Sequence, residues 1–313
     1  MSLALREVDG VEITSLMDNF FDAIMAGNET ARRAPLTRDV FSRPQPRAEH
    51  GSSMLITISW EGHRESLLLD TGITPDGVLH NVDALRVEPG PLRAIVLSHG
   101  HVDHTGGLMA ALARFGRDVP VHVHPDAFRK RKVVFPDGRE VDMPQLNPDA
   151  LAAAGVTVVA GHEPSLLVDG HVLLSGEVAR TTGFEKGLPN QHAEVDGQWQ
   201  PDPATCDDQA VVMHVRDKGL VVVTGCGHSG IVNTLRYAQA LTGVSALYAV
   251  IGGLHLSGAN FEKIIPPTVA ELERLAPQII VPCHCTGWKA AQAIATALPW
   301  AFIPNSVGTR YVL

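Results

Sequence analysis

Three histidines and one aspartate fall within six residues of the segment LSHGHVDHTGGL, which covers residues 97–108. Because residues two apart on an extended segment point the same way, His99 and His101 can bind one cation together. Asp103 and His104 are adjacent, so their side chains diverge and suit a second cation nearby. Imidazole and carboxylate are the usual ligands of catalytic zinc, and of iron or manganese in similar sites. The pattern predicts a site for one or two divalent metal ions; a polar helix start with incidental histidines is the alternative.

The overall charge argues against one class of partner. The 313 residues include 25 Lys+Arg and 34 Asp+Glu, a formal net charge of −9, whereas a nucleic-acid-binding surface is normally basic. No stretch approaches the roughly 18 apolar residues of a membrane span, and the N-terminus lacks the pattern of a signal peptide. Four cysteines do not make a disulfide framework. We expect a cytoplasmic protein with a small-molecule substrate and no nucleic-acid or membrane partner; its oligomeric state is open.

Antiparallel strand pairs and strand–helix units alternate along the chain without a linker-like break. Strands are predicted at 11–20, 54–60, 65–70, 92–98, 119–124, 155–160, 171–178, 209–215, 219–225, 246–253 and 278–282, and helices at 105–116, 231–243, 266–276 and 287–298. Polar segments near 27–50, 125–150 and 180–208 are predicted to be insertions, the first a loop or lid and the second a hairpin. The sequence thus predicts a single α/β (α+β) domain over residues 1–313, with two mixed sheets inside and helices outside.

Several longer segments carry a family resemblance. They are, in chain order, VDGVEITSLMDN, SHGHVDHTGGL, LLSGEVARTTGFEKGLP, DDQAVVM, GLVVVTGCGHSGIVNT, GGLHLSGANFEKIIPPTV and VPCHCTGWKA. Together they run over nearly the whole chain. The chain resembles the metallo-β-lactamase superfamily, and within it the dihydropterin-ribofuranosyl-aminobenzene-phosphate synthase-like subgroup. This resemblance implies a four-layer αββα sandwich and a metal-dependent enzyme.

The resemblance also implies roles for residues outside the first cluster. Asp70, in LLLDTG, stands where the family has a buried aspartate that supports the metal loop by hydrogen bonds without binding metal. His228 and His284 stand at predicted strand ends and fit the remaining ligand positions. We therefore expect the metal ligands to be His99, His101, Asp103, His104, His228 and His284.

One departure from the family pattern affects the second ion. Most dinuclear members have Gly-Asp after the strand at 220–224, and the aspartate bridges both metals, whereas this chain has Cys226 there. Cys226 could be a thiolate ligand, which would favour zinc or iron. Alternatively, Asp207 or Asp208 could supply the carboxylate, or the second ion could be weak or absent. We favour His228 as the ligand with Cys226 as a buried neighbour, because a lone buried cysteine usually acts as a small apolar residue.

Other histidines receive different interpretations. His255, in GGLHLSG, is expected to line the pocket and contact the substrate, and Asn19 could approach the same pocket. His162 superficially matches the family's Gly-His ligand motif, but the segment at Cys226 fits that role better. His122 and His124 alternate on a predicted strand, which favours a solvent-facing or edge position.

These residues predict a hydrolase that uses a metal-activated water on a small phosphoester or an ester or lactone. Asp103 could ligate, orient the nucleophile or pass a proton to the leaving group, and His255 would contact the developing oxyanion. Zinc is the expected ion, with iron or manganese as alternatives. One alternative function is a metal-dependent phosphoribosyl transferase or synthase of the dihydropterin pathway type. The other is a non-hydrolytic iron redox or sensor module, which the cysteines motivate.

Overall fold

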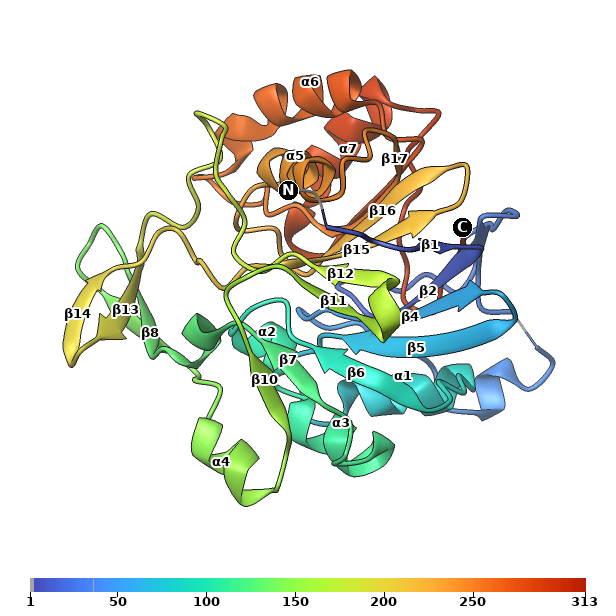
Figure 1. Cartoon of the computed structure of the whole chain (residues 1–313), viewed down its shortest axis with the longest axis horizontal. Helices are drawn as coiled ribbons and strands as arrows, with labels where there is room; N and C mark the ends of the chain where they lie inside the picture. Colours follow the sequence, from blue (N-terminus) through green and yellow to red (C-terminus); the bar gives the residue numbers. More distant parts are fainter. Residues whose placement is uncertain (1–2, 36) are drawn as a thin grey trace.

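The computed structural model describes residues 3–35 and 37–313, and two large mixed sheets form its centre (Figure 1). The first sheet contains, in spatial order, β10 (Val158–Ala160), β7 (Val121–Val123), β6 (Leu92–Val96), β5 (His63–Leu69), β4 (Ser53–Trp60), β2 (Gly10–Met17), β19 (Arg310–Val312) and β3 (Ala31–Arg32). Strands β5, β6, β7 and β10 are parallel neighbours, and the other pairs are antiparallel. The predicted strand pair around residue 62 is therefore confirmed as β4 and β5.

The second sheet contains, in spatial order, β11 (Ser165–Leu167), β12 (Val172–Leu174), β15 (Ala210–Val215), β16 (Gly219–Thr224), β17 (Leu247–Gly253) and β18 (Ile279–Cys283), with β1 (Glu7–Val8) beside β15. Strands β16, β17 and β18 are parallel, while β15 pairs with β16 in antiparallel orientation. Helices between parallel strands cross over on one face, as such connections require.

Alternating side chains along the strands create four layers. In β5, Leu67 points into the core between the sheets, whereas Leu68 points to the opposite face. In β16, Val221 points into the same central core and Val222 to the outer face. The outer faces are covered by α1 (Gly77–Leu85) and α3 (Leu108–Phe115) on one side and by α5 (Ile231–Thr242), α6 (Ile265–Leu275) and α7 (Trp288–Ala297) on the other (Figure 1). The predicted αββα sandwich is confirmed, since strands with two apolar faces must be covered on both.

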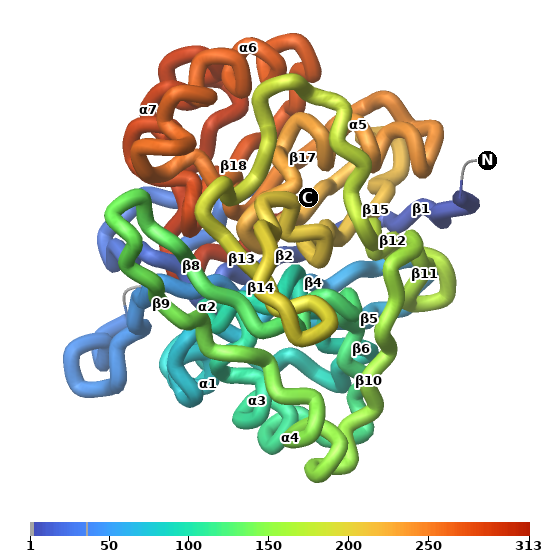
Figure 2. Tube along the Cα trace, turned by 90° about the vertical axis from the view of Figure 1, so that its left-hand side faces the viewer, coloured from blue at the N-terminus to red at the C-terminus, as the bar shows by residue number. Residues whose placement is uncertain are grey.

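A third, smaller sheet joins two of the predicted insertions. Its strands are, in spatial order, β14 (Gln198–Pro201), β13 (Gln191–Val195), β8 (Arg131–Val134) and β9 (Glu140–Met143). Figure 2 views the molecule from the side on which this sheet lies in front of the sandwich. The prediction of a hairpin within 125–150 is confirmed by β8 and β9. The polar segment predicted at 180–208 contains two strands that the sequence analysis did not predict, β13 and β14, and β13 pairs with β8 in the middle of this sheet.

The segment after the metal-type cluster also differs from the prediction. The expected helix at 105–116 is split into α2 (Val102–Thr105) and α3 by two glycines. A Cβ atom on Gly106 would lie 2.0 Å from the carbonyl oxygen of Ile73, and one on Gly107 would lie 2.2 Å from that of Thr71. The backbone is therefore packed too closely for any side chain here.

Smaller differences complete the comparison. Helix α1 and the short α4 (Pro148–Ala153) were not predicted, and short 3-10 turns occur at Val40–Ser42, Pro125–Phe128, Val168–Gly170, Glu262–Ile264 and His284–Thr286. His124 is fully buried, so the prediction of a solvent-facing or edge position is wrong for it, while His122 is half-buried on β7, between β6 and β10. Among the described residues, no helix is both long and apolar enough to cross a membrane.

Candidate metal centre

Residues predicted for the site, both ligands and their neighbours, meet at one edge of the two sheets. Each follows the carboxyl end of a central strand: Asp70 after β5, His99 and His101 after β6, His228 after β16, His255 after β17 and His284 after β18. Parallel strands present their carboxyl ends at the same edge, which is where ligands bind in open α/β sheets.

One group of ligand atoms comes from His99, His101 and His228, whose ring nitrogens lie within 4.8 Å of one another. The Nε2 atoms of His99 and His228 are 3.1 Å apart, close to the roughly 3.3 Å expected for two ligands about 2 Å from one tetrahedral ion. All three rings are buried. Burial lowers the pKa of His99 and of His228 well below the usual value and that of His101 to about 4. The rings are therefore neutral near pH 7, the form that binds metal.

Gln191 determines which nitrogen of His101 faces this group. Its side-chain NH₂ donates to the backbone oxygen and Oδ2 of Asp202, at 3.1 and 3.2 Å, and to Thr205 Oγ1 at 3.1 Å. Its Oε1 atom must therefore be the one that lies 2.8 Å from His101 Nε2. An amide oxygen only accepts, so His101 Nε2 carries the proton and Nδ1 has the free lone pair. Gln191 lies on β13, and no local sequence pattern marks it as a site residue.

A second group comes from Asp103, His104, Cys226 and His284. Cys226 Sγ lies 3.2 Å from His104 Nε2, and Asp103 Oδ2 lies 3.2 Å from His284 Nε2 and 3.6 Å from His104 Nε2. The buried Nε2 atom of His284 makes no hydrogen bond to any described residue. His284 Nε2 thus faces the Asp103 carboxylate without forming a hydrogen bond to it. This arrangement is expected when both atoms bind the same ion. Two imidazoles, one carboxylate and one cysteine sulfur form a donor set that fits zinc, although burial in the metal-free protein raises the pKa of the Cys226 thiol.

Asp70 and Ser98 orient the histidines of both groups. Asp70 is buried, with one oxygen accepting from the Ser98 backbone N–H at 2.7 Å and the other accepting from Ser98 Oγ at 2.7 Å and from His104 Nδ1 at 2.6 Å. Ser98 Oγ in turn lies 3.0 Å from His99 Nδ1. These contacts hold the Nδ1 protons of His99 and His104 and leave both Nε2 atoms free for metal, as in other histidine metal sites.

Asn19 and Asp18 hold His284 in the same manner. Asn19 Oδ1 lies 3.0 Å from His284 Nδ1, and Asn19 Nδ2 donates to the His284 backbone oxygen. Asp18 accepts from the His284 backbone N–H at 2.7 Å. His284 has a φ of +48°, a conformation that non-glycine residues rarely adopt. The structure thus places Asn19 beside a candidate ligand.

The two aspartates considered as substitutes for the usual bridging carboxylate lie outside both groups. Asp207 binds the Arg131 guanidinium through both oxygens, at 3.0 and 2.6 Å, and accepts from the Gly100 backbone N–H at 2.8 Å. Asp208 accepts from the Ser229 backbone N–H at 2.8 Å, and burial raises its pKa to about 6. Cys226 is the nearer candidate, and whether it binds metal or is only a buried neighbour stays a prediction.

His255 borders the site from β17. Its ring centroid lies 4.2 Å from that of His228 and 4.4 Å from that of Phe261, and its φ is +43°. Its side chain, with those of Cys226 and His228, forms a further group of potential ligand atoms. Residues held in such rare backbone conformations cluster at functional sites.

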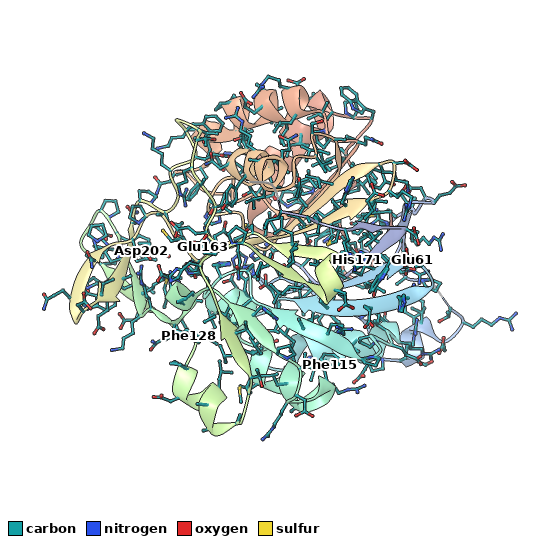
Figure 3. All side chains as sticks on the ribbon, viewed as in Figure 1. Glu61, Phe115, Phe128, Glu163, His171 and Asp202 are labelled. Atoms are coloured by element: carbon teal, nitrogen blue, oxygen red, sulfur yellow. The ribbon has the colours of Figure 1, made fainter. Side chains whose placement is uncertain are left out.

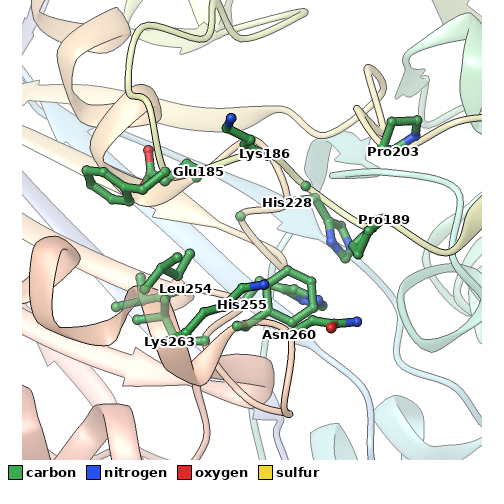
Figure 4. A pocket seen from close by; sticks show the side chains of 16 residues that line it. Glu185, Lys186, Pro189, Pro203, His228, Leu254, His255, Asn260 and Lys263 are labelled. Atoms are coloured by element: carbon green, nitrogen blue, oxygen red, sulfur yellow. The ribbon is translucent and has the colours of Figure 1, made fainter.

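Two adjoining pockets open beside these histidines and share Pro189, His228, His255, Asn260 and Phe261. One, of about 590 Å³, extends to Lys186 and Lys263 (Figure 4). The other, of about 440 Å³, reaches Asp103 and Cys226 and is walled by Val133, Phe135 and Met143 of the third sheet and its turn. Both volumes suit a small molecule.

His50 is a further site residue that the sequence did not reveal. It is exposed, its Nε2 lies 3.7 Å from Asp103 Oδ2, and its ring centroid lies 4.9 Å from that of His284. Asn19 Nδ2 lies 3.3 Å from His50 Nδ1. In sequence it is a single histidine at the end of the Arg- and Pro-rich segment 27–50, so no local pattern distinguishes it from a surface residue.

Known proteins share both the sequence pattern and the fold. The family model of the metallo-beta-lactamase superfamily matches residues 46–241. The 7,8-dihydropterin-6-methyl-4-(beta-D-ribofuranosyl)-aminobenzene-5'-phosphate synthase of Methanocaldococcus jannaschii is 30% identical over 253 residues, 78% of this chain and 83% of that protein. An uncharacterized protein of the same archaeon is 29% identical over 244 residues, 78% of this chain and 86% of that one. The crystal structure of a metal-dependent hydrolase of the beta-lactamase superfamily has a TM-score of 0.71 at 23% identity and covers 96% of this chain and 98% of its own. The chain therefore belongs to the metallo-beta-lactamase superfamily, as an enzyme of the subgroup that includes the first of these relatives.

Proposed function

We propose that the protein is a metal-dependent hydrolase that uses a metal-activated water on a small phosphoester, ester or lactone. The observation that carries this proposal is the position of two adjacent ligand groups beside one pocket, whose lining includes His101, Asp103, Cys226 and His228. A bound divalent cation would lower the pKa of water and polarise the bond under attack. We expect zinc, since the donors are imidazole, carboxylate and thiolate; iron or manganese are the alternatives.

Asp103 and His255 are the proposed catalytic residues. Asp103 Oδ2 lies between His104 and His284, and although burial acts to raise its pKa, the charges of these histidines hold it below the usual value. As an ionised carboxylate at the pocket wall, it can orient a water by accepting a hydrogen bond from it. His255 lines both pockets and can donate to a substrate oxygen on which negative charge develops.

The pocket walls indicate the kind of substrate. Val133, Phe135 and Met143 offer an apolar surface on one side of the metal centre. Lys186 and Lys263 border the other pocket from two separate segments (Figure 4). We infer a substrate with an apolar body and an anionic group, which favours a phosphorylated compound over a neutral lactone.

Metal content and hydrolysis test this function together. We expect about two metal ions per chain by plasma mass spectrometry, and turnover of chromogenic phosphoesters or of lactones without any second organic substrate. His101→Ala should lose both metal and turnover. His63→Ala is the matched control, because His63 is exposed and belongs to none of the ligand groups found among the described residues. Turnover that survives His101→Ala would refute the proposal.

The synthase relative motivates a second candidate, a metal-dependent transferase or synthase that acts on a phosphoribosyl donor. Such an enzyme would use the same ligand groups, but its turnover would depend on a second organic substrate. Omitting that substrate distinguishes the two candidates: product formed from one compound and water alone supports the hydrolase, and strict dependence on two compounds supports the synthase.

A further inference from the structure

A separate group of metal-type side chains lies outside the centre described above. His124 follows β7, and His162 follows β10, its parallel neighbour in the first sheet. Glu177 follows β12, which belongs to the second sheet. Three segments from two sheets therefore converge on one point. Figure 3 labels Glu163, next to His162, on the same side of the molecule as Asp202 of the third sheet's segment and far from His171 and Glu61.

The donor atoms of this group are close and held in place. His162 Nδ1 lies 3.1 Å from His124 Nε2, and the ring centroids are 4.6 Å apart. One ring nitrogen of each histidine and a Glu177 carboxylate oxygen all lie within 4.8 Å of one another. The Glu177 backbone N–H donates to the His162 backbone oxygen at 2.9 Å. Gly176, with a φ of +61°, makes that contact possible, because a Cβ there would lie 2.3 Å from the same oxygen.

We propose that His124, His162 and Glu177 bind a transition-metal ion of the zinc type, at a site distinct from the catalytic centre. Two imidazoles and a carboxylate favour zinc over magnesium or calcium, which prefer oxygen ligands alone. The pocket beside them, of about 430 Å³, is lined by His162, Glu177 and Cys206, so an ion can enter from solvent. Cys206 lines the same pocket but does not belong to the ligand group, and burial raises the pKa of its thiol to about 11, so the fourth position is left to water.

The hydrogen bonds of His124 limit the affinity of this site. Its Nδ1 accepts from the backbone N–H of Asp126 at 3.1 Å, so the ring proton lies on Nε2 and points to His162 Nδ1. An ion bound at Nε2 must replace that proton, and the Asp126 contact must then weaken. The main centre has no such conflict, since Nε2 of His99 and of His104 is left free by Ser98 and Asp70. We therefore expect this site to bind zinc more weakly than the main centre.

The position of the site suggests a structural role. An ion there would tie the ends of β7 and β10 in the first sheet to the segment after β12 in the second. The same pocket includes Ser229, the neighbour of His228, so the site adjoins the turn that carries a candidate catalytic ligand. Binding at this point would stabilise the folded state by mass action without supplying an atom to the reaction.

The test is a zinc titration of the metal-free full chain against a chromophoric competing chelator, with thermal unfolding measured in parallel. The variants are Glu177→Gln, which keeps the size of an exposed side chain, and His162→Ala, also at an exposed position. His63→Ala is the control. We expect the wild type and His63→Ala to bind one weak equivalent of zinc beyond those of the main centre, and to melt at a higher temperature when it is filled.

Loss of that weak equivalent in Glu177→Gln and His162→Ala, with the tight equivalents and the folded-state circular dichroism unchanged, would support the proposal. Equal stoichiometry and equal zinc-dependent melting in all four proteins would overturn it. The result does not depend on the proposed hydrolase, since turnover is not measured and the main centre is left intact. If the wild type shows no hydrolysis while Glu177→Gln and His162→Ala lose the weak zinc equivalent, the hydrolase proposal is refuted and the proposal of a second metal site is supported.

Discussion

Replacing Gln191 with Leu should weaken metal binding at one of the two proposed ligand groups and leave the other intact. The substitution removes the acceptor 2.8 Å from His101 Nε2 but keeps a side chain of similar size. The His101 ring then loses the contact that fixes its tautomer and orientation. Outer-shell partners of metal-bound histidines typically contribute 10- to 100-fold in metal affinity. At about 1.4 kcal/mol per tenfold, the expected loss is about 1.4–2.8 kcal/mol at the group of His99, His101 and His228.

The same substitution also affects the apoprotein. Asp202 and Thr205 lose the donor that Gln191 supplies, and all these side chains are buried. Each polar group left without a partner costs about 1–3 kcal/mol. We therefore expect the metal-free variant to unfold at lower denaturant concentration, with an unchanged slope. Metal affinity must be measured at denaturant concentrations well below the unfolding transition, so that weaker metal binding is not confused with loss of folded protein.

Competitive zinc titration, followed by cobalt substitution, measures the effect. We expect one weakened zinc-binding step and one unchanged step. The visible spectrum of the cobalt ion bound at the group of His99, His101 and His228 should also change. The control is Gln198→Leu, which makes the same change at an exposed position on β14 of the same sheet. Unchanged affinity at both steps in Gln191→Leu would show that the amide does not position His101.

Three further predictions concern neighbouring groups. Cys226→Ser should lose about one metal equivalent and the near-ultraviolet thiolate band of the cobalt-substituted protein; retention of both would make Cys226 a buried neighbour only. Arg131→Met should destabilise the fold by about 3–5 kcal/mol in chemical denaturation, because it leaves the buried Asp207 carboxylate without its partner, and adding Asp207→Asn should restore part of that loss. Lys263→Ala should raise KM for an anionic substrate by up to about fivefold, the effect of roughly 1 kcal/mol from an exposed charge, with kcat unchanged and a neutral substrate unaffected; an equal effect on both substrates would exclude an electrostatic role.

The sequence predicts the sandwich well because its central strands carry unambiguous patterns. The runs at β5, β6, β16 and β17 are apolar on both faces, which requires a covered sheet. The histidine cluster could be placed for a related reason, since it directly follows one of these runs. His228 and His284 also follow buried strands, so the geometry of strand ends brings them to the same edge.

The residues that sequence analysis missed all depend on contacts between distant segments. His50, Gln191 and Arg131 lie in the polar insertions, whose local patterns resemble ordinary loops. Gln191 and Arg131 reach the site when β8 pairs with β13, more than 50 positions away along the chain. His50 reaches it through contacts with Asp103 and His284. His124 likewise contacts a segment distant in sequence, since its ring packs against His162, which follows β10.

The insertions that form the third sheet both line the pocket and contact the histidines of the candidate metal centre. Val133, Phe135 and Met143 form the apolar wall of the substrate pocket. From the same sheet, Gln191 holds His101, and Arg131 binds Asp207, which in turn binds the backbone between His99 and His101. A substitution that reshapes the pocket wall therefore acts on strands that also position the proposed metal ligands. Substrate preference and metal affinity should therefore change together in variants of β8 and β13. In variants of the Lys186 and Lys263 segments, substrate preference should change while metal affinity stays the same.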